Sequence, residues 1–115
     1  MKSIEQKNAE AVTAFIEDTA NRRLLEETEQ FFVSQFLKAF TDRHYAIDEI
    51  LAQGDKAIAR IFITAVHTGP FAGHPSTGKA VKATQFREFH VIDGKIAGHR
   101  GWYDTATLLP QIQAQ

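Results

Sequence analysis

The stretch AVKATQFREFHVIDGKIAGHRGWY, residues 80–103, predicts two long β-strands joined by a short turn. We expect the strands over residues 80–92 and 95–103, with Ile92, Asp93 and Gly94 at the connection, because Asp-Gly between strand-like runs is a strong hairpin signal. The sequence allows two pairing registers for this hairpin. A three-residue bulged turn pairs His90 with Ile96, whereas a two-residue Asp93-Gly94 turn shifts every pair by one residue.

The sequence before this hairpin predicts a second one. Residues 44–53 alternate between apolar and polar, residues 53–55 (QGD) signal a turn, and residues 56–67 form a β-branched run. Residues 68–79 contain three glycines and two prolines, which predicts a loop between the two hairpins.

The first third of the chain has helical periodicity, and no Gly or Pro occurs before Gly54. We expect one helix from about Ser3, as N-cap, to about Ala20, and one or two more within residues 24–40. Helices followed by an antiparallel or mixed meander make an α+β layer architecture. Long strands twist strongly, so the sheet is expected to curl around the helices and enclose a cone-shaped pocket on its concave side.

Length and composition favour one globular domain over residues 1–115, with 43% hydrophobic and 23% charged residues. A net charge of -1 with scattered Lys and Arg disfavours nucleic acid and membrane partners. The absence of cysteine excludes disulfides, thiolate catalysis and Cys-ligated zinc. The first ten residues are polar and lack the apolar core of a signal peptide, so we expect a cytoplasmic protein.

Four sequence features occur in a fixed order: HTGPFAGHPSTGK (residues 67–79), FHVIDGKI (residues 89–96), Asp104, and LLPQI (residues 108–112). Together they resemble the SnoaL-like polyketide cyclases of the nuclear transport factor 2-like superfamily, whose loop typically has the pattern H-T-G-x-F-x-G-x-P-x-T-G-K/R. The resemblance is close over about residues 47–112 and loose over the N-terminal helices. It implies a cystatin-like, cone-shaped fold, a small apolar carbonyl-containing ligand, and a homodimer formed through the sheet.

Two departures from the family pattern bear on the pocket. Family members usually carry a longer segment between the second and third helices, with a short strand and pocket residues, for which residues 29–35 leave almost no room. In the last strand, Arg100 stands where the family often has Trp, and Gly98 stands where Glu is common. We therefore expect pocket chemistry that differs from that of the family's cyclases.

The resemblance implies that Asp104 is a catalytic acid/base, which moves a proton at carbon next to a carbonyl during an intramolecular aldol closure. Such a carboxyl needs a pKa raised toward neutrality by burial, and Trp102 could supply the apolar wall. The competing interpretation is that Asp104 is the N-cap of a helix beginning near Thr105, because Asp is favoured at that position.

The resemblance also implies a pocket role for His90. With the three-residue turn, five side chains share the face of Asp104 and are expected to line one cavity with it: His90, Glu88, Phe86, Arg100 and Trp102. With the two-residue turn, Asp104 lies opposite Ala83, on the face away from His90. The alternative for His90 is a half-buried sheet histidine with a local hydrogen bond.

The other polar candidates have simpler explanations. Glu88 and Arg100 have the same parity and could form an ion pair or an anion contact in the pocket, but a solvated salt bridge explains them as well. His67, His74 and His99 are expected in loops or on the exterior. No H-x-H or H-E-x-x-H spacing occurs, so we expect no metal and no other cofactor.

One stretch of the sequence matches a phosphate-binding motif only in part. GHPSTGKA, residues 73–80, resembles the phosphate-binding pattern G-x-x-x-x-G-K-[ST], but Ala80 replaces the hydroxyl residue. A strand is expected to follow instead of a helix, so no helix dipole would face a phosphate. We expect no nucleotide binding.

The leading hypothesis is a cofactor-free cyclase that closes a ring in an apolar carbonyl substrate, with Asp104 exchanging protons. An isomerase or epoxide hydrolase on the same scaffold needs a further acid or base, for which the sequence offers no convincing candidate. The alternative of another class is a non-catalytic small-molecule-binding or dimerisation module, which the short helical region favours.

Overall fold

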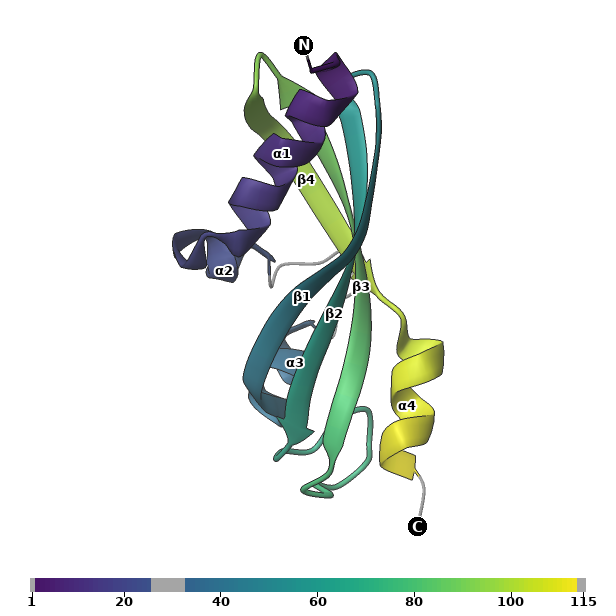
Figure 1. Ribbon diagram of the computed structural model, residues 1–115. Coiled ribbons are helices and arrows are strands. Elements are labelled where there is room, and N and C mark those ends of the chain that lie inside the picture. Colours follow the sequence, from purple (N-terminus) through teal and green to yellow (C-terminus); the bar gives the residue numbers. More distant parts are fainter. Residues whose placement is uncertain (1, 26–32, 114–115) are drawn as a thin grey trace.

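A computed structural model describes residues 2–25 and 33–113 (Figure 1). The chain begins with helices and continues as a four-stranded antiparallel sheet in the order β1-β2-β3-β4, as the sequence predicted. The elements are α1 (Ile4–Glu17), η1 (Thr19–Asn21), α2 (Arg22–Leu25), α3 (Val33–Ala39), β1 (Phe40–Gln53), β2 (Lys56–His67), β3 (Ala80–Ile92), β4 (Lys95–Tyr103) and α4 (Thr105–Gln113). The molecule is elongated, with extents of 53 × 21 × 20 Å.

The first helix begins where the sequence predicted but ends at Glu17. Ser3 is its N-cap and forms a capping box with Gln6, whose N–H donates to the Ser3 hydroxyl at 3.1 Å. At the other end, Asp18 has an extended backbone and its carboxylate accepts a hydrogen bond from the Ala20 N–H at 2.9 Å. This local hydrogen bond starts the turn η1, so the helix does not continue to Ala20.

The first strand begins at Phe40, four residues before the predicted start at His44. Phe40 is buried and pairs with His67 at the end of β2, with their rings 5.0 Å apart. The helix before it, α3, ends at Ala39, whose carbonyl accepts hydrogen bonds from Thr68 and Gly69. The middle of the predicted helical region, residues 26–32, lies outside the described residues.

The turn between β3 and β4 has two residues, so the three-residue turn and its pairing of His90 with Ile96 are wrong. Ile92 pairs with Lys95. Asp93 and Gly94 both have positive φ, 50° and 76°, which is what the favoured two-residue hairpin turn requires.

The shorter turn alone would place each residue of β4 on the opposite face from the one predicted. A β-bulge in β4 returns the residues beyond it to the predicted face. Val91 pairs with Ile96 while His90 pairs with Gly98, which makes Ala97 the extra residue. The predicted set of residues therefore does share one face, although its partners are shifted. The observed pairs are Phe86–Trp102 and Glu88–Arg100, in place of Phe86–Arg100 and Thr84–Trp102.

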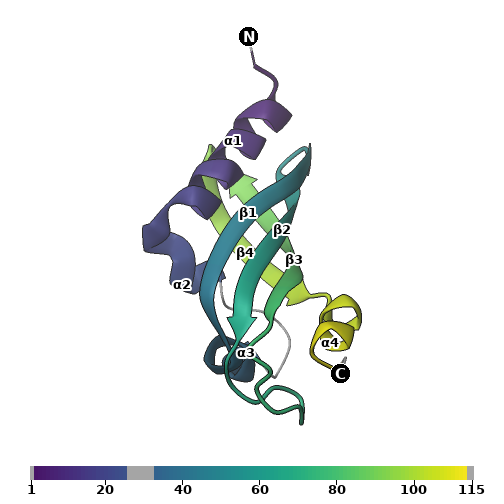
Figure 2. The same cartoon turned by 60° about the horizontal axis from the view of Figure 1, so that its bottom comes forward.

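The concave face of the sheet carries the core. Odd-numbered positions 57–67 on β2 and 81–91 on β3 are buried, whereas the even-numbered positions face the other way. Helices α1 and α2 lie along one side of the sheet (Figure 2). Phe15 of α1 packs edge-on against Phe89 at 5.7 Å, and Phe36 of α3 stacks on Tyr103 at 4.2 Å.

The last helix, α4, completes the edge of β3 beyond the end of β4. The ladder between these strands ends at the pair of Gln85 and Tyr103. Further along, the Gln111 side chain accepts a hydrogen bond from the Lys82 N–H at 2.9 Å and donates one to the Lys82 carbonyl at 2.8 Å. A single amide thus satisfies the donor and the acceptor that a fifth strand would otherwise pair.

Among residues 2–25 and 33–113, no helix combines the length and the apolar character that crossing a membrane requires.

Candidate functional site

Asp104 stands between β4 and α4, where it caps the helix. Its N–H donates to the Thr84 carbonyl at 2.8 Å, which extends the β3–β4 pairing by one bond. Its Oδ1 accepts a hydrogen bond from the Thr107 N–H at 3.2 Å, and its Oδ2 accepts one from the Thr107 hydroxyl at 2.7 Å. This geometry confirms the N-cap interpretation. The cap is compatible with acid/base chemistry, because a capping carboxylate can still exchange a proton.

The residue before Asp104 belongs to an aromatic cluster. Its neighbour Tyr103 is buried and stacks on Phe36 with an interplanar angle of 23°. Phe36 in turn packs against Phe40 at 4.8 Å and against Phe71 of the loop at 6.1 Å. Asp104 follows this cluster directly in the chain and is half-buried.

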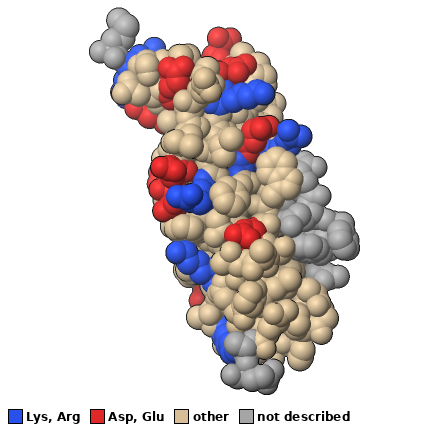
Figure 3. All heavy atoms as spheres, turned by 90° about the vertical axis from the view of Figure 1, so that its right-hand side faces the viewer, with Lys and Arg blue, Asp and Glu red and all other residues tan. Residues whose placement is uncertain are grey.

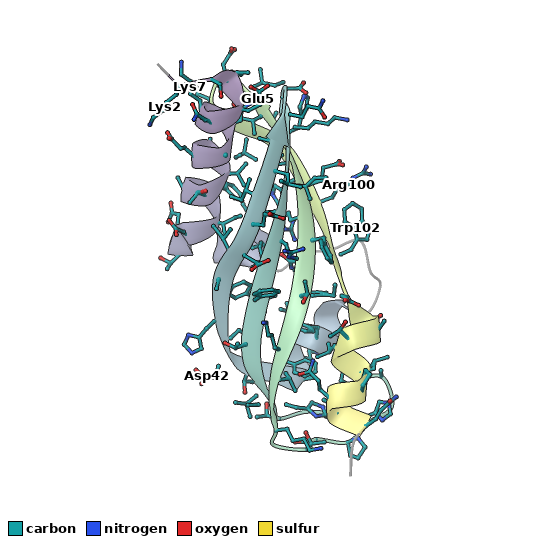
Figure 4. All side chains as sticks on the ribbon, turned by 45° about the vertical axis from the view of Figure 1, so that its right-hand side comes forward. Lys2, Glu5, Lys7, Asp42, Arg100 and Trp102 are labelled. Atoms are coloured by element: carbon teal, nitrogen blue, oxygen red, sulfur yellow. The ribbon has the colours of Figure 1, made fainter. Side chains whose placement is uncertain are left out.

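The other five predicted site residues lie on the outer face of the sheet, so the expectation that they line one cavity is corrected. Phe86 and Trp102 are 38% and 36% exposed. Arg100 donates to Glu88 at 3.2 Å and lies over the Trp102 ring at 5.4 Å. Arg100 and Trp102 project from the side of the sheet away from α1 (Figure 4).

His90 is also on the outer face, where its Nε2 is 2.8 Å from the Asp55 carboxylate. This hydrogen bond lowers the pKa of Asp55. The Val91 N–H donates to the Asp55 carbonyl at 2.7 Å, so together these contacts hold the β1–β2 turn against β3. His90 lies six residues along β3 from Thr84, the backbone partner of Asp104, which separates the two side chains by about 20 Å. The structure does not bring them together.

The polar residues that do face the concave side are ones that the sequence analysis missed. Gln85 and Arg87 are 0% and 1% exposed, and His99 is half-buried on β4. The expectation that His99 lies in a loop or on the exterior is wrong, and so is the same expectation for His67, which ends β2 and is fully buried. A signal was present: the odd positions 81, 83, 89 and 91 of β3 are all apolar, which assigns Gln85 and Arg87 to the buried face.

Arg87 connects the sheet to the helical layer. Its guanidinium donates to the Leu25 carbonyl at 2.8 Å, to the Gln85 side chain at 3.3 Å and to the His99 Nδ1 at 2.7 Å. A guanidinium can only donate, so the Nδ1 of His99 is the acceptor and a neutral ring carries its proton on Nε2. Gly101 pairs with Arg87 and makes room for it, because a Cβ there would lie 3.0 Å from the guanidinium carbon.

Hollows on the surface of the described part of the chain include the following. One of about 580 Å³ lies between the loop at Thr77 and the end of α4 at Ile112. One of about 590 Å³ lies at the β1–β2 turn beside Leu51 and Ile58. Another, of about 440 Å³, lies beside Ile47 and the end of α1. Within residues 2–25 and 33–113, no group of three His, Cys, Asp or Glu side chains could hold a metal ion.

Comparison with known proteins identifies the family. The family model of SnoaL-like polyketide cyclases matches residues 6–112. AclR of Streptomyces galilaeus, a proposed hydroxylase, is 29% identical over 84% of this chain and 67% of its own, with a TM-score of 0.59. IdmH of Streptomyces antibioticus, a proposed polyketide cyclase, is 30% identical over 71% of this chain and 60% of its own, with a TM-score of 0.59.

A SnoaL-like polyketide cyclase of Agrobacterium tumefaciens strain C58 is 13% identical and shares the fold over 96% of this chain and 98% of its own, with a TM-score of 0.64. No curated protein matches the sequence. The family match covers nearly all of α1, all four strands and nearly all of α4. This chain therefore belongs to the SnoaL-like polyketide cyclase family.

Proposed function

We propose that the protein is a cofactor-free enzyme of the cyclase type, in which Asp104 moves a proton at carbon beside a carbonyl of an apolar ligand. The observation that carries this proposal is the orientation of the Asp104 carboxylate by two hydrogen bonds from Thr107, directly after Tyr103 of the aromatic cluster. Removal of the proton gives an enolate, whose carbon attacks a second carbonyl of the same ligand. The proton then passes from Asp104 to the new alkoxide oxygen.

The two oxygens of Asp104 are suited to different tasks. The Thr107 N–H can only donate, so Oδ1 remains an acceptor throughout. The Thr107 hydroxyl can rotate and accept instead of donate, so Oδ2 is the oxygen that can carry a proton without losing its partner. This arrangement would allow the side chain to change protonation while α4 stays capped.

The substitution Asp104→Asn tests the proposal, because Asn caps helices about as well as Asp but cannot exchange the proton. The probe is 2-acetylnaphthalene in D2O, with loss of its methyl proton signal followed by NMR. We expect the wild-type chain to accelerate exchange and D104N to lower that rate by about 100-fold or more. Thermal unfolding of D104N should remain close to that of the wild type.

The matched control is Thr107→Val, which keeps the carboxylate but removes the hydroxyl that bonds Oδ2. We expect T107V to unfold at a lower temperature and to retain measurable exchange. If the wild type does not accelerate exchange, or if D104N exchanges as fast, Asp104 is a helix cap alone. Retention of the probe without exchange would then favour the non-catalytic binding module.

The outer face of the sheet favours a second role, self-association, and we propose that two copies pack through it. Large apolar side chains are exposed there: Leu51, Ile58, Phe86 and Trp102. Three cations on the same face have partners within the chain, Arg60 on Asp48, Arg100 on Glu88, and Lys82 over the Phe62 ring at 3.7 Å. Figure 3 shows large uncharged areas between scattered charges on this side.

The dimensions of this face suit a dimer. Strand spacing and rise give four strands a face of about 19 by 35 Å, or roughly 650 Å² in projection. A stable interface buries about 800 Å² of accessible surface on each partner, and side chains make the accessible surface larger than its projection. A two-fold axis would bring the same patch of each copy together. The ion pairs of the patch are already formed within each chain.

A further inference from the structure

His67 is a buried histidine to which the proposed reaction gives no role. It is the last residue of β2, has 0% exposure, and stacks on the Phe40 ring at 5.0 Å. The loop of residues 68–79 leaves the strand at His67 and returns to it. The His67 N–H donates to the Lys79 carbonyl at 2.9 Å, and the Gly78 N–H donates to the His67 carbonyl at 2.8 Å.

The side chain of His67 fastens the same loop. Its Nδ1 accepts a hydrogen bond from the Thr77 N–H at 3.3 Å and lies 2.9 Å from the Thr77 hydroxyl. Because a backbone N–H can only donate, Nδ1 must be unprotonated and the proton of the neutral ring is on Nε2. That Nε2 is buried and has no hydrogen-bond partner among the described residues.

The surroundings oppose a positive charge on His67. The basic residues on the elements around it are Lys38 on α3, Arg43 on β1, and His74 and Lys79 in the loop. The acidic residue in the nearby part of β1, Asp42, bonds His44 on the exposed surface at 3.2 Å, and α4 has no charged residue. Burial lowers the pKa of His67, the backbone of Gly69 raises it, and the charge of His74 lowers it, so that the net effect is a lowered pKa.

We propose that His67 is a proton-sensitive latch that holds the loop of residues 68–79 closed while neutral and releases it when protonated. A second proton would have to sit on Nδ1, where the Thr77 N–H already points, so that N–H contact would be lost and only the contact with the Thr77 hydroxyl could remain, with Nδ1 as the donor. Release of the loop would also withdraw Phe71, which is 1% exposed and packs on Phe40 at 5.1 Å. The latch is independent of the reaction proposed for Asp104, since its readout is opening of the loop and not turnover.

The direction of the pH effect follows from the two states. In the closed loop the pKa of His67 is lowered, whereas in the open loop the ring reaches water and has its ordinary value of about 6.5. The open state therefore binds protons more strongly. Below about pH 6.5 the opening constant should rise by up to tenfold per pH unit, until the pH reaches the lowered pKa of the closed state.

Hydrogen exchange of the full chain, read by NMR between pH 7.5 and 5 and corrected for intrinsic exchange rates, measures this opening. The reporters are the amides of His67 and Gly78, which are bonded across the closed loop. The reference is Ile61, a buried residue in the middle of β2. We expect opening at the reporters to increase as the pH falls, while opening at the reference stays constant.

Two variants assign the effect. His67→Asn keeps an acceptor near the position of Nδ1 and does not titrate, so opening should become independent of pH. His74→Gln removes a neighbouring charge that lowers the pKa of His67 in the closed loop. Opening should therefore still depend on pH, with the midpoint of the transition at higher pH. The latch is overturned if opening in the wild type does not change with pH, if H67N keeps the slope, or if H74Q removes it. If H67N does not fold, the wild-type ring signals decide, because the titration of His67 must coincide with loop opening.

Discussion

At the scale of single residues, the pair of Arg87 and Gly101 makes the sharpest stability prediction. A Cβ on residue 101 would lie 3.0 Å from two guanidinium atoms of Arg87, which is buried and bonded to the Leu25 carbonyl. Gly101→Ala should therefore force Arg87 to shift and reduce the free energy of unfolding by about 1–3 kcal/mol. Urea denaturation followed by circular dichroism measures the loss.

The control lies three residues away on the same strand. A Cβ on Gly98 would meet no atom within 4 Å, and Gly98 does not have a positive φ. Gly98→Ala should therefore change the free energy of unfolding by less than about 0.5 kcal/mol. Equal effects of G98A and G101A would show that the loss of glycine matters at both sites and that the guanidinium contact does not.

Asp104 shows, also at the residue scale, which role of a side chain the sequence can predict and which it cannot. An aspartate two residues after Trp102 and just before a helix satisfies the pattern of an N-cap and that of a pocket acid equally well. The cap depends on the next three residues and could be predicted locally. The proton-transfer role depends on what a ligand would contact, which no local pattern contains.

At the scale of secondary-structure elements, the sequence predicted the strands better than the faces they bury. The run of residues 80–92 has apolar side chains at both parities, and the face predicted to line the pocket, which includes Phe86, is the exposed one. The buried parity instead has the smaller Val81 and Ala83 together with Gln85 and Arg87. The bulge at Ala97 was also unpredictable, because it depends on the pairing between strands and not on any residue of its own strand.

Helix α4 provides the prediction at this scale. The Gln111 amide accepts from the Lys82 N–H and donates to the Lys82 carbonyl, on the edge of β3 beyond the end of its ladder with β4. Gln111→Glu keeps the acceptor and loses the donor, so it should lower the free energy of unfolding by about 1 kcal/mol. Gln111→Leu loses both and should cost more. In Gln111→Leu, faster hydrogen exchange at the Lys82 amide would locate the effect.

Gln113→Ala is the comparison on the same helix. Gln113 is exposed and contacts the His74 ring at 3.4 Å, so its loss should leave the Lys82 amide protected. If Q113A speeds exchange at Lys82 as much as Q111L does, the helix as a whole holds the edge and the Gln111 amide has no special role.

At the scale of the whole molecule, the outer face of the sheet determines the proposed assembly. Trp102 is the one tryptophan of the chain and is 36% exposed on that face, so its fluorescence reports directly on whether the face is covered. On dilution of the wild type we expect the emission to shift to longer wavelength as the dimer dissociates. Light scattering at the same concentrations should show the mass falling from two chains to one.

Substitution of the neighbouring aromatic residue tests the interface itself. Phe86 pairs with Trp102, and Phe86→Glu would place a charge in the centre of the proposed contact. Burying such charges without partners is costly, so F86E should be monomeric while keeping its fold. Ile4→Glu is the control, because Ile4 is 55% exposed on α1, away from this face. A wild-type chain that stays monomeric at every concentration, with constant Trp102 emission, would refute the interface and leave the apolar face open to another partner.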